Sequence, residues 1–292
     1  MIIFIYAILV FLVLRFSVTL FNFLSNPKLN RYGRRFSDLV SVILLPNPDE
    51  DITALIRSID KQDYKDLELI IKSEDEDDQM TIARANGKYL LFLDPDMEIS
   101  DGLLNNLIHR TKVFNLSLLN VIPTQKPGPV TTWFAVPLRE FLVLNMYPLR
   151  LMRLINSPAF SVGHTGCMFF TTDDYRSGKS RDRMETLLAN GLVVASPSRF
   201  NVEGRQLLQV FANSGFAAII YLILAMAGPV AMFIYLDPSF LALPVGLIFL
   251  SRIMVSFLTN QNPLINILLH PLQMMVLTWL LMREVWIKMR QF

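Results

Sequence analysis

The apolar residues of this chain gather at its two ends, and this distribution limits the fold more than any other feature. The run IIFIYAILVFLVLRFSVTLFNFL begins at Ile2, and further runs cover 217–236, 239–258 and 263–282. A helix needs about 20 largely apolar residues to cross a bilayer. The sequence therefore predicts one N-terminal and two to three C-terminal transmembrane helices, and with them a multi-pass protein of the cell membrane.

Two features of these runs leave alternatives open. Three full C-terminal crossings would place the basic tail REVWIKMRQF outside, although its charges favour the inner side. Prolines such as Pro271 are compatible with one segment that is re-entrant or lies along the interface. In the first run, Arg15 either snorkels to the headgroups, which we favour, or belongs to an interior ion pair.

Charged residues crowd into the middle of the chain and predict a soluble domain there. We expect an anchor over 1–25, a soluble domain over 26–212 and a transmembrane region over 213–292. The flank NPKLNRYGRR after the first run is basic, so the positive-inside rule places this domain on the cytoplasmic side. The net charge of +2 gives no bulk electrostatic reason for nucleic-acid binding.

The soluble domain alternates between two periodicities. Short apolar runs that end in turn residues predict buried strands over 38–46, 67–75 and 88–96. The segments that follow them have helical spacing, and the last of these has Ser100 or Asp101 as its predicted N-cap. This alternation predicts an α/β fold with a mainly parallel sheet and helices on both faces.

The third predicted strand ends in Asp94-Pro95-Asp96, at the edge where open α/β sheets bind ligands. Two carboxylates this close repel each other unless a positive group lies beside them. A hard divalent cation that bridges to a phosphate meets this need, and an ordinary turn is the alternative. The glycine-rich motifs of dinucleotide and P-loop sites do not occur, so those sites are disfavoured.

The first half of the soluble domain contains four short motifs: Asn47 with Asp49-Glu50, Gln62-x-Tyr64, Ala85-x-Gly87-x-Tyr89 and Asp94-x-Asp96. These motifs resemble those of family 2 glycosyltransferases with the GT-A fold. The resemblance covers about residues 1–210 at the level of motifs. The hydrophobic C-terminal cluster with LLHPL is similar to the layout of membrane-bound members that act on lipid-like acceptors, such as carotenoid glycosyltransferases.

This resemblance implies a GT-A-like fold and a set of roles. It implies transfer of a sugar from a nucleotide-sugar donor to a lipid-like or membrane-associated acceptor. Asp94 and Asp96 are implied to hold Mg²⁺ or Mn²⁺ with the donor diphosphate. Asn47, Asp49 and Glu74, together with Asp94, are implied to line the nucleotide pocket.

The catalytic base is the point where the chain departs from the family pattern. The family places a Glu-Asp pair before a helix that ends in Ala-x-Gly, and the matching segment here is 180–196, which we interpret as a helix. Its pair is not intact, so the neighbouring carboxylates Asp182 and, second, Glu185 are the candidate bases. The alternative is that both are solvated charges on a helix face.

The altered motifs also favour a second function for the chain. Ser73-Glu74 stands where the family has Asp-Asp. A catalytically degenerate relative would keep the fold and act as a partner or scaffold in a membrane biosynthetic complex, whereas Asp94-x-Asp96 favours the enzyme. Between these motifs, the arginines of 150–158 fall in a segment predicted as an amphipathic helix on the bilayer or a plain surface helix.

Overall fold

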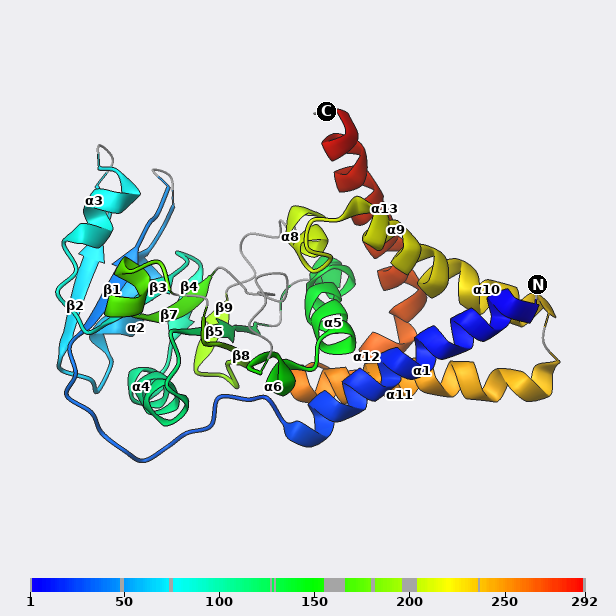
Figure 1. Ribbon diagram of the computed structural model, residues 1–292, viewed down its shortest axis with the longest axis horizontal. Coiled ribbons are helices and arrows are strands. Elements are labelled where there is room, and N and C mark those ends of the chain that lie inside the picture. Colours follow the sequence, from blue (N-terminus) through cyan, green and yellow to red (C-terminus); the bar gives the residue numbers. More distant parts are fainter. Residues whose placement is uncertain are drawn as a thin grey trace. The chain divides into compact units, whose positions relative to one another are not determined.

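The computed structural model describes residues 2–47, 50–73, 76–126, 128, 130–154, 166–179, 182–195, 204–235 and 237–290. The chain divides into two compact units, whose elements are labelled in Figure 1. Unit 1 comprises Met1–Asn26, Gly128–Pro148 and Phe200–Phe292, and unit 2 comprises Pro27–Pro127 and Leu149–Arg199. The segment Gly128–Pro148, which the sequence places in the soluble domain, thus groups with the apolar helices.

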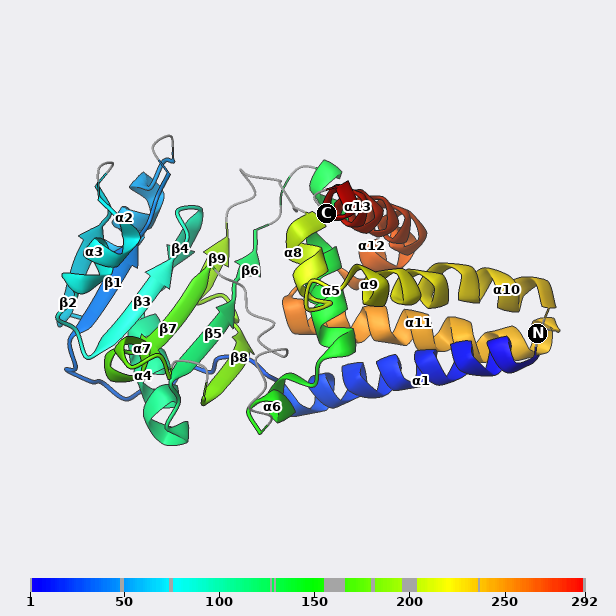
Figure 2. The same cartoon turned by 45° about the horizontal axis from the view of Figure 1, so that its top comes forward.

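A six-stranded sheet in the order β2-β1-β3-β7-β5-β8 forms the centre of unit 2, as Figure 2 shows. Its strands are β1 Val40–Leu44, β2 Leu67–Ile71, β3 Tyr89–Leu93, β5 Leu118–Ile122, β7 Cys167–Thr171 and β8 Met184–Leu188. The first three strands are parallel, as the sequence predicts, and β5 is parallel to β8. Because β7 runs antiparallel to both β3 and β5, the sheet is mixed.

Helices cover both faces of this sheet, which confirms the predicted α/β class. Alternate residues of the strands point to opposite faces. Those of one face, such as Val42 and Leu91, pack in one core with α2 (Thr53–Asp60) and α4 (Leu103–Phe114). The opposite face packs with residues of α3 (Asp78–Ala83) and α7 (Thr172–Arg176). Two-sided burial explains why β1 and β3 are apolar at nearly every position.

Two local predictions for unit 2 are wrong. The N-cap of α4 is Gly102, with a φ of +85°, because the Ser100 hydroxyl instead donates a hydrogen bond to the Gly191 carbonyl. The segment predicted as a helix over 180–196 contains the strands β8 and β9 (Val193–Ala195). Parallel pairing of β8 with β5 and a left-handed turn at Asn190 and Gly191, both with positive φ, enforce the extended form there.

A second, three-stranded sheet has the order β4-β9-β6. β4 (Met97–Ile99) follows β3, β6 (Thr124–Gln125) follows β5, and β9 follows β8. Each of its strands thus continues from the carboxyl end of a strand in the large sheet. Lys126 and Glu98 form an ion pair of 2.6 Å in this small sheet.

Unit 1 is helical in its described residues. Its helices are α1 Ile2–Ser25, η1 Val130–Phe134, α5 Val136–Met146, α8 Gly204–Gln209, α9 Gly215–Leu222, η3 Ile223–Ala227, α10 Gly228–Tyr235, α11 Pro238–Thr259, α12 Pro263–Leu268 and α13 His270–Arg290. Among the described residues, Ile3–Ser25, Gly215–Tyr235 and Pro238–Thr259 are long and apolar enough to cross a membrane. The third C-terminal run, in contrast, is divided between α12 and α13.

Polar side chains fasten α1 to α5 inside this apolar unit. The Thr19 hydroxyl donates to Oδ1 of Asn145 at 2.8 Å, and the Asn22 amide donates to the carbonyls of Leu144 and Tyr147 at 2.9 and 2.8 Å. These groups are buried, where an unmade hydrogen bond costs about 1–3 kcal/mol. The bonds therefore fix the register between the first helix and α5, and α1 also packs along α11.

Candidate functional site

The carboxyl ends of β1, β2 and β3 meet at one edge of the large sheet. Their last residues, Leu44, Ile71 and Leu93, are aligned in register. Because β7 is antiparallel, its first residue, Cys167, lies opposite Leu93 at the same edge. The segments that follow the three parallel strands therefore begin at the same edge of the sheet.

Asp94 and Asp96 lie on a hydrogen-bonded turn at this edge. The Met97 amide donates to the Asp94 carbonyl at 3.2 Å, which closes a four-residue turn with Pro95 in its second position. The Asp94 amide donates to the carbonyl of Gly166 at 2.8 Å and so fixes the turn to the start of β7. Both aspartates are half-buried. The turn interpretation is therefore correct, and the same turn places two aspartates at the carboxyl edge of the parallel strands.

The charge at this edge affects the pKa of Cys167, which is fully buried. Burial raises the pKa of the Cys167 thiol, and the negative charge of Asp94 raises this pKa further. Cys167 is thus a packed, protonated thiol and not a nucleophile. The effect also shows that the Asp94 carboxylate lies close to the first residue of β7.

Asn47, at the end of β1, closes a small loop with Glu50. The backbone and side-chain amides of Asn47 donate to the two Glu50 oxygens, each at 3.0 Å, and the Glu50 amide donates back to the Asn47 carbonyl at 3.0 Å. Beyond β2, Lys72 forms an ion pair of 2.6 Å with Asp78. The edge therefore carries a basic group as well as carboxylates. The predicted pocket residues Asp49 and Glu74 lie outside the described residues.

The donor set at this edge fits a hard divalent cation in chemical type. Asp94 and Asp96 offer carboxylate oxygens, the ligands that Mg²⁺ and Mn²⁺ prefer. Within the described part of the chain, no group of three or more His, Cys, Asp and Glu side chains is placed to hold a metal ion. Two protein carboxylates are a common number for Mg²⁺, which keeps water and phosphate oxygens as its other ligands.

The structure does not bring Asp182 to this edge. Met184, the first residue of β8, is aligned with Leu118 of β5, which pairs with Phe170 of β7 and so lies level with the start of β3. Asp182 therefore precedes β8 at the amino edge of the sheet, about 15 Å from the carboxyl edge for strands of five residues. Its side chain is exposed. Its role as a general base stays an untested prediction.

Glu185, the second candidate base, is the centre of a buried ion cluster. Its side chain is 0% exposed, and its two oxygens accept hydrogen bonds from Nε and Nη2 of Arg110 at 2.7 and 2.6 Å. Arg150 and Arg153 approach the same carboxylate at 3.6 and 3.8 Å. The contacts with Arg110 occupy both oxygens of the buried carboxylate. A structural role is the simplest account of Glu185, and a role as a base stays untested.

This cluster also changes the interpretation of the arginines in 150–158. The described helix there, α6, covers only Leu149–Met152. Arg153 stacks on the Phe114 ring at 4.0 Å, and Arg110 stacks on the same ring at 3.9 Å. Arg150 and Arg153 therefore face Glu185 and its aromatic neighbour. The sequence around Glu185 gives no signal for this cluster, because its main partner, Arg110, lies 75 residues away.

Two residues of the Ala-x-Gly-x-Tyr motif, Gly87 and Tyr89, have a packing role. The Gly87 amide donates to the Ser41 hydroxyl at 2.8 Å and to Glu68 at 3.0 Å, and Ser41 itself donates to Glu68. A Cβ on Gly87 would lie 2.5 Å from both the amide nitrogen and the hydroxyl oxygen of Ser41. Tyr89 stacks on Phe169 with ring centroids 5.0 Å apart. Gly87 and Tyr89 thus join β3 to its neighbouring strands.

A groove of about 480 Å³ lies beside the small sheet. It is lined by residues of α2 and of the segment around β4: Ala54, Arg57, Ser58, Lys61, Gln62, Glu98, Ile99, Ser100 and Asp101. Asp94 and Asp96 do not line it. Gln62, part of the Gln-x-Tyr motif, donates to the Ile99 carbonyl at 3.5 Å and so connects α2 with β4.

No protein-family model matches this chain, and no curated protein is similar to it in sequence. Among solved structures, the mannosyltransferase PcManGT from Pyrobaculum calidifontis, in complex with GDP-Man and Mn²⁺, has a TM-score of 0.47 and 13% identity, covering 90% of this chain and 99% of that one. S. aureus TarS 1–349 in complex with UDP-GlcNAc has a TM-score of 0.40 and 12% identity, covering 74% and 81%. Glucosyl-3-phosphoglycerate synthase from Mycobacterium tuberculosis, with Mn²⁺, UDP-Glc and phosphoglyceric acid, has a TM-score of 0.38 and 12% identity, covering 63% and 84%. At these values the likenesses do not establish an activity for this chain.

Proposed function

We propose that this chain is a membrane-anchored glycosyltransferase of the GT-A type, similar to family 2 members. It transfers a sugar from a nucleotide-diphosphate donor to a lipid-like or membrane-associated acceptor, assisted by a divalent cation. The observation that carries the proposal is the turn with Asp94 and Asp96. It follows β3 at the edge where the ends of β1 and β2 and the start of β7 also meet.

In this proposal, the edge residues bind and orient the donor. Asp94 and Asp96 hold Mg²⁺ or Mn²⁺, which neutralises the charge of the departing nucleoside diphosphate when it is bound. Asn47 and the two residues outside the described ranges, Asp49 and Glu74, line the nucleotide pocket. The hydrogen bond from the Asp94 amide to the Gly166 carbonyl holds the Asp94 backbone beside the start of β7.

The membrane part of the proposal rests on unit 1 and on the basic flank after α1. Three described helical segments are long and apolar enough to cross a bilayer. Lys28, Arg31, Arg34 and Arg35 follow the first of them, and by the positive-inside rule this basic flank supports a cytoplasmic location for unit 2 in our proposal. A catalytic unit attached to such helices has ready access to acceptors dissolved in the bilayer.

The second candidate function is a non-catalytic relative that serves as partner or scaffold in a membrane biosynthetic complex. The position of the candidate bases favours it. Asp182 precedes β8 at the amino edge, and Glu185 is saturated by Arg110. A transferase would therefore need another group to accept the proton of the acceptor hydroxyl.

Titration calorimetry of the full chain in detergent separates the two functions. UDP and GDP are titrated with and without Mn²⁺, followed by ADP and CDP. The enzyme requires binding of at least one nucleotide that depends on Mn²⁺ and disappears in Asp96→Asn. Folded protein that binds none of the four nucleotides would overturn the proposal and leave the scaffold function.

Asp173→Asn is the matched control, because it removes an exposed carboxylate at the opposite edge of the same sheet, at the start of α7. Cation-dependent binding should persist in this variant. Equal loss in Asp96→Asn and Asp173→Asn would assign the effect to net charge and refute the site. Once a donor and an acceptor are identified, unchanged turnover in Asp182→Asn would refute the base assignment alone.

A further inference from the structure

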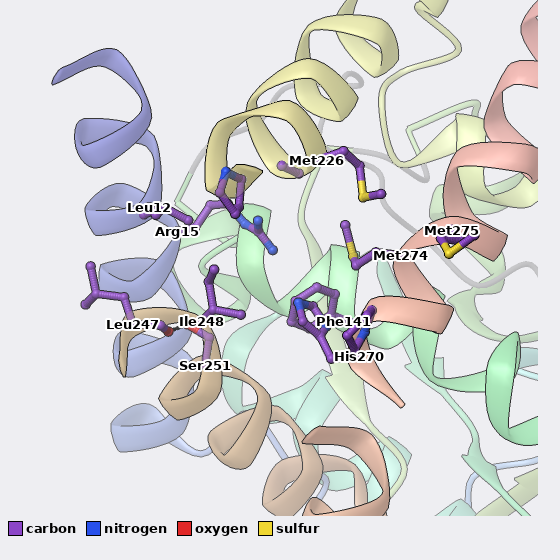
Figure 3. A pocket seen from close by; sticks show the side chains of 13 residues that line it. Leu12, Arg15, Phe141, Met226, Leu247, Ile248, Ser251, His270, Met274 and Met275 are labelled. Carbon is purple, nitrogen blue, oxygen red and sulfur yellow. Dashed lines mark hydrogen bonds between the residues drawn. The ribbon is translucent and has the colours of Figure 1, made fainter. Parts of the chain in front are cut away.

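Unit 1 contains a pocket of about 310 Å³ inside its apolar helices, shown in Figure 3. It is lined by Leu12, Arg15, Phe141, Ala225, Met226, Pro229, Leu247, Ile248, Ser251, His270, Pro271, Met274 and Met275. Most of these side chains are apolar, and three are methionines, which adapt to ligands of different shape. The volume is at the lower end of the range of about 300–1,000 Å³ for ligand pockets.

Arg15 brings a permanent positive charge into this pocket. It lies ten residues before the end of α1 at Ser25, or about 15 Å along the helix, and so near the middle of the span. Figure 3 shows its side chain reaching from α1 toward the centre of the pocket. The guanidinium lies 5.3, 5.2 and 5.1 Å from the ring centroids of Phe11, Phe141 and Tyr221. The preferred prediction of snorkelling is therefore wrong, because Arg15 faces the helix bundle.

A second arginine lies directly behind the pocket. Arg252 of α11 is 1% exposed and lies 3.5 Å from the centroid of the Phe141 ring, so both guanidinium groups contact the same ring. Its Nε donates a hydrogen bond of 2.8 Å to Nδ1 of His270. Because Nδ1 accepts this bond, we assign the imidazole proton to Nε2, so that His270 is a neutral donor in the lining of the pocket.

The charge of these two arginines is not balanced within the described part of unit 1. Arginine stays protonated in proteins. Nε of Arg15 and Nη2 of Arg252 are buried without a hydrogen-bond partner, and neither guanidinium forms an ion pair with a described carboxylate. Cation–π contacts with the neighbouring rings attract the two guanidinium groups, but they supply no counter-charge. The interior ion pair considered for Arg15 is thus absent from the described residues, and an anion is the missing partner.

From this geometry we infer that the pocket is an intramembrane binding site for an amphiphile with one hydrocarbon chain and an anionic head. The head, a carboxylate or a phosphate, lies against the Arg15 guanidinium, with His270 as a second donor. The chain lies along the apolar wall and leaves past the exposed residues Pro271 and Met275 on α13. This site does not depend on the proposed glycosyl transfer, which concerns unit 2.

The apolar walls favour an amphiphile over a free anion. A free phosphate would use Arg15 and His270 but would leave the rest of the lining, including Leu12 and the three methionines, without contact. A neutral lipid would fill the apolar volume but would leave the arginine charge unpaired. Only a molecule with both parts satisfies the whole lining.

The inference is tested by equilibrium binding to the full chain in phosphatidylcholine nanodiscs, with bound probe measured by native mass spectrometry. The probes are hexadecanoate, hexadecyl phosphate, hexadecanol and inorganic phosphate, without nucleotide or sugar. We expect at least one of the two anionic amphiphiles to bind at least tenfold more tightly than hexadecanol, and inorganic phosphate not to compete. Which of the two binds more tightly then distinguishes a carboxylate head from a phosphate head.

Two variants of Arg15 separate its charge from its packing. Arg15→Gln should weaken binding of the anionic probes at least tenfold and leave hexadecanol unchanged, whereas Arg15→Lys should retain most of the affinity. Arg283→Gln is the matched control, since Arg283 is an exposed arginine of the same unit that stacks on Trp279 at 5.8 Å and does not line the pocket. Anionic binding in this control should equal that of the parent chain.

A variant at the pocket rim keeps the test valid if Arg15→Gln does not fold. Met275 is 61% exposed, so Met275→Trp narrows the exit with a larger side chain at a position outside the packed core, and it should reduce binding at least fivefold. Equal affinity for hexadecanol and the anionic probes, or full binding in folded Arg15→Gln, would overturn the inference. Displacement by millimolar inorganic phosphate would replace it with a free-anion site.

Discussion

Replacing Glu185 by Gln should strongly destabilise unit 2, although the two side chains have almost the same volume. The substitution removes the negative charge from a carboxylate that is 0% exposed and leaves Arg110, whose side chain is 8% exposed, without its counter-charge. The neutral amide can accept one hydrogen bond from the guanidinium but cannot reproduce the two charge-assisted bonds of 2.7 and 2.6 Å.

The size of the effect follows from which charges are buried. Removing one partner of a buried ion pair costs about 3–5 kcal/mol, because the other charge stays desolvated. Arg150 and Arg153 are more exposed, at 22% and 29%, and lie 3.6 and 3.8 Å away, so solvent screens most of their contribution. We therefore expect a loss of about 3–5 kcal/mol, which Arg110 dominates.

Hydrogen exchange of the full chain in detergent measures this loss where it arises. The amides of β8 and β5 exchange through opening of the sheet, and their exchange rate rises tenfold for each 1.4 kcal/mol lost. The Glu185→Gln variant should therefore exchange at least 100-fold faster than the parent chain in Met184–Leu188. Amides of α11 in unit 1 provide an internal reference that should not change.

The more accessible pair of Arg183 and Asp174 is the matched control for burial. Its N–O distance of 2.9 Å is similar, but its side chains are 43% and 19% exposed, so Asp174→Asn should cost less than about 1 kcal/mol. A change below threefold in Glu185→Gln, or an equal change in both variants, would refute the burial argument. Stable Glu185→Gln that has lost only activity would instead return Glu185 to the list of candidate bases.

Two further predictions concern the amino end of β3. Gly87→Ala places a Cβ 2.5 Å from the backbone amide nitrogen of Ser41, which cannot rotate away. We therefore expect the free energy of unfolding, measured by chemical denaturation, to fall by about 1–3 kcal/mol. An unchanged free energy of unfolding would refute this contact. Burial tends to raise the pKa of Glu68, but hydrogen bonds from Ser41, Asn86 and Gly87 outweigh it and hold this pKa below its usual value of 4.5. Because the folded pKa is depressed, the stabilisation by Glu68 is present above pH 4.5 and is lost as the pH falls through the folded pKa. Glu68→Gln should therefore cost about 2 kcal/mol at pH 7 and progressively less in acid, and a pH-independent difference would contradict this assignment.

The parallel core of unit 2 was predictable because its signals are local. β1, β2 and β3 are short apolar runs that end in turn residues. This pattern is typical of strands that are buried on both faces. β8 was not predictable in the same way. Its second residue, Glu185, is a charge whose burial depends on Arg110, which is 75 residues away in the sequence. Nothing near Glu185 in the sequence distinguishes it from a solvated helix-face charge.

The same distinction between local signals and long-range packing applies to the candidate site. Asp94 and Asp96 follow directly from the end of a predicted strand, so their edge of the sheet was known from the strand alone. The edge to which Asp182 belongs depends on the direction of β8, and this direction is set by its pairing with β5. The charge at Arg15 was visible in the sequence, but its partners come from α5 and α9, which only the packing of unit 1 identifies.

The Ala-x-Gly-x-Tyr and Asp-x-Asp motifs differ in whether the packing of the fold requires their residues. Gly87 is required by the close approach of Ser41, and Tyr89 by its stacking in the core, so a chain that kept only the fold would keep both residues. The half-buried turn at the other end of β3 has no such need, because Asn, Ser or Gly would close it equally well and would avoid the repulsion of two carboxylates. The turn alone does not explain why both positions are Asp, and the proposed Mg²⁺ or Mn²⁺ would use both carboxylates. This contrast favours the transferase over the scaffold, even though the altered base region favours the opposite.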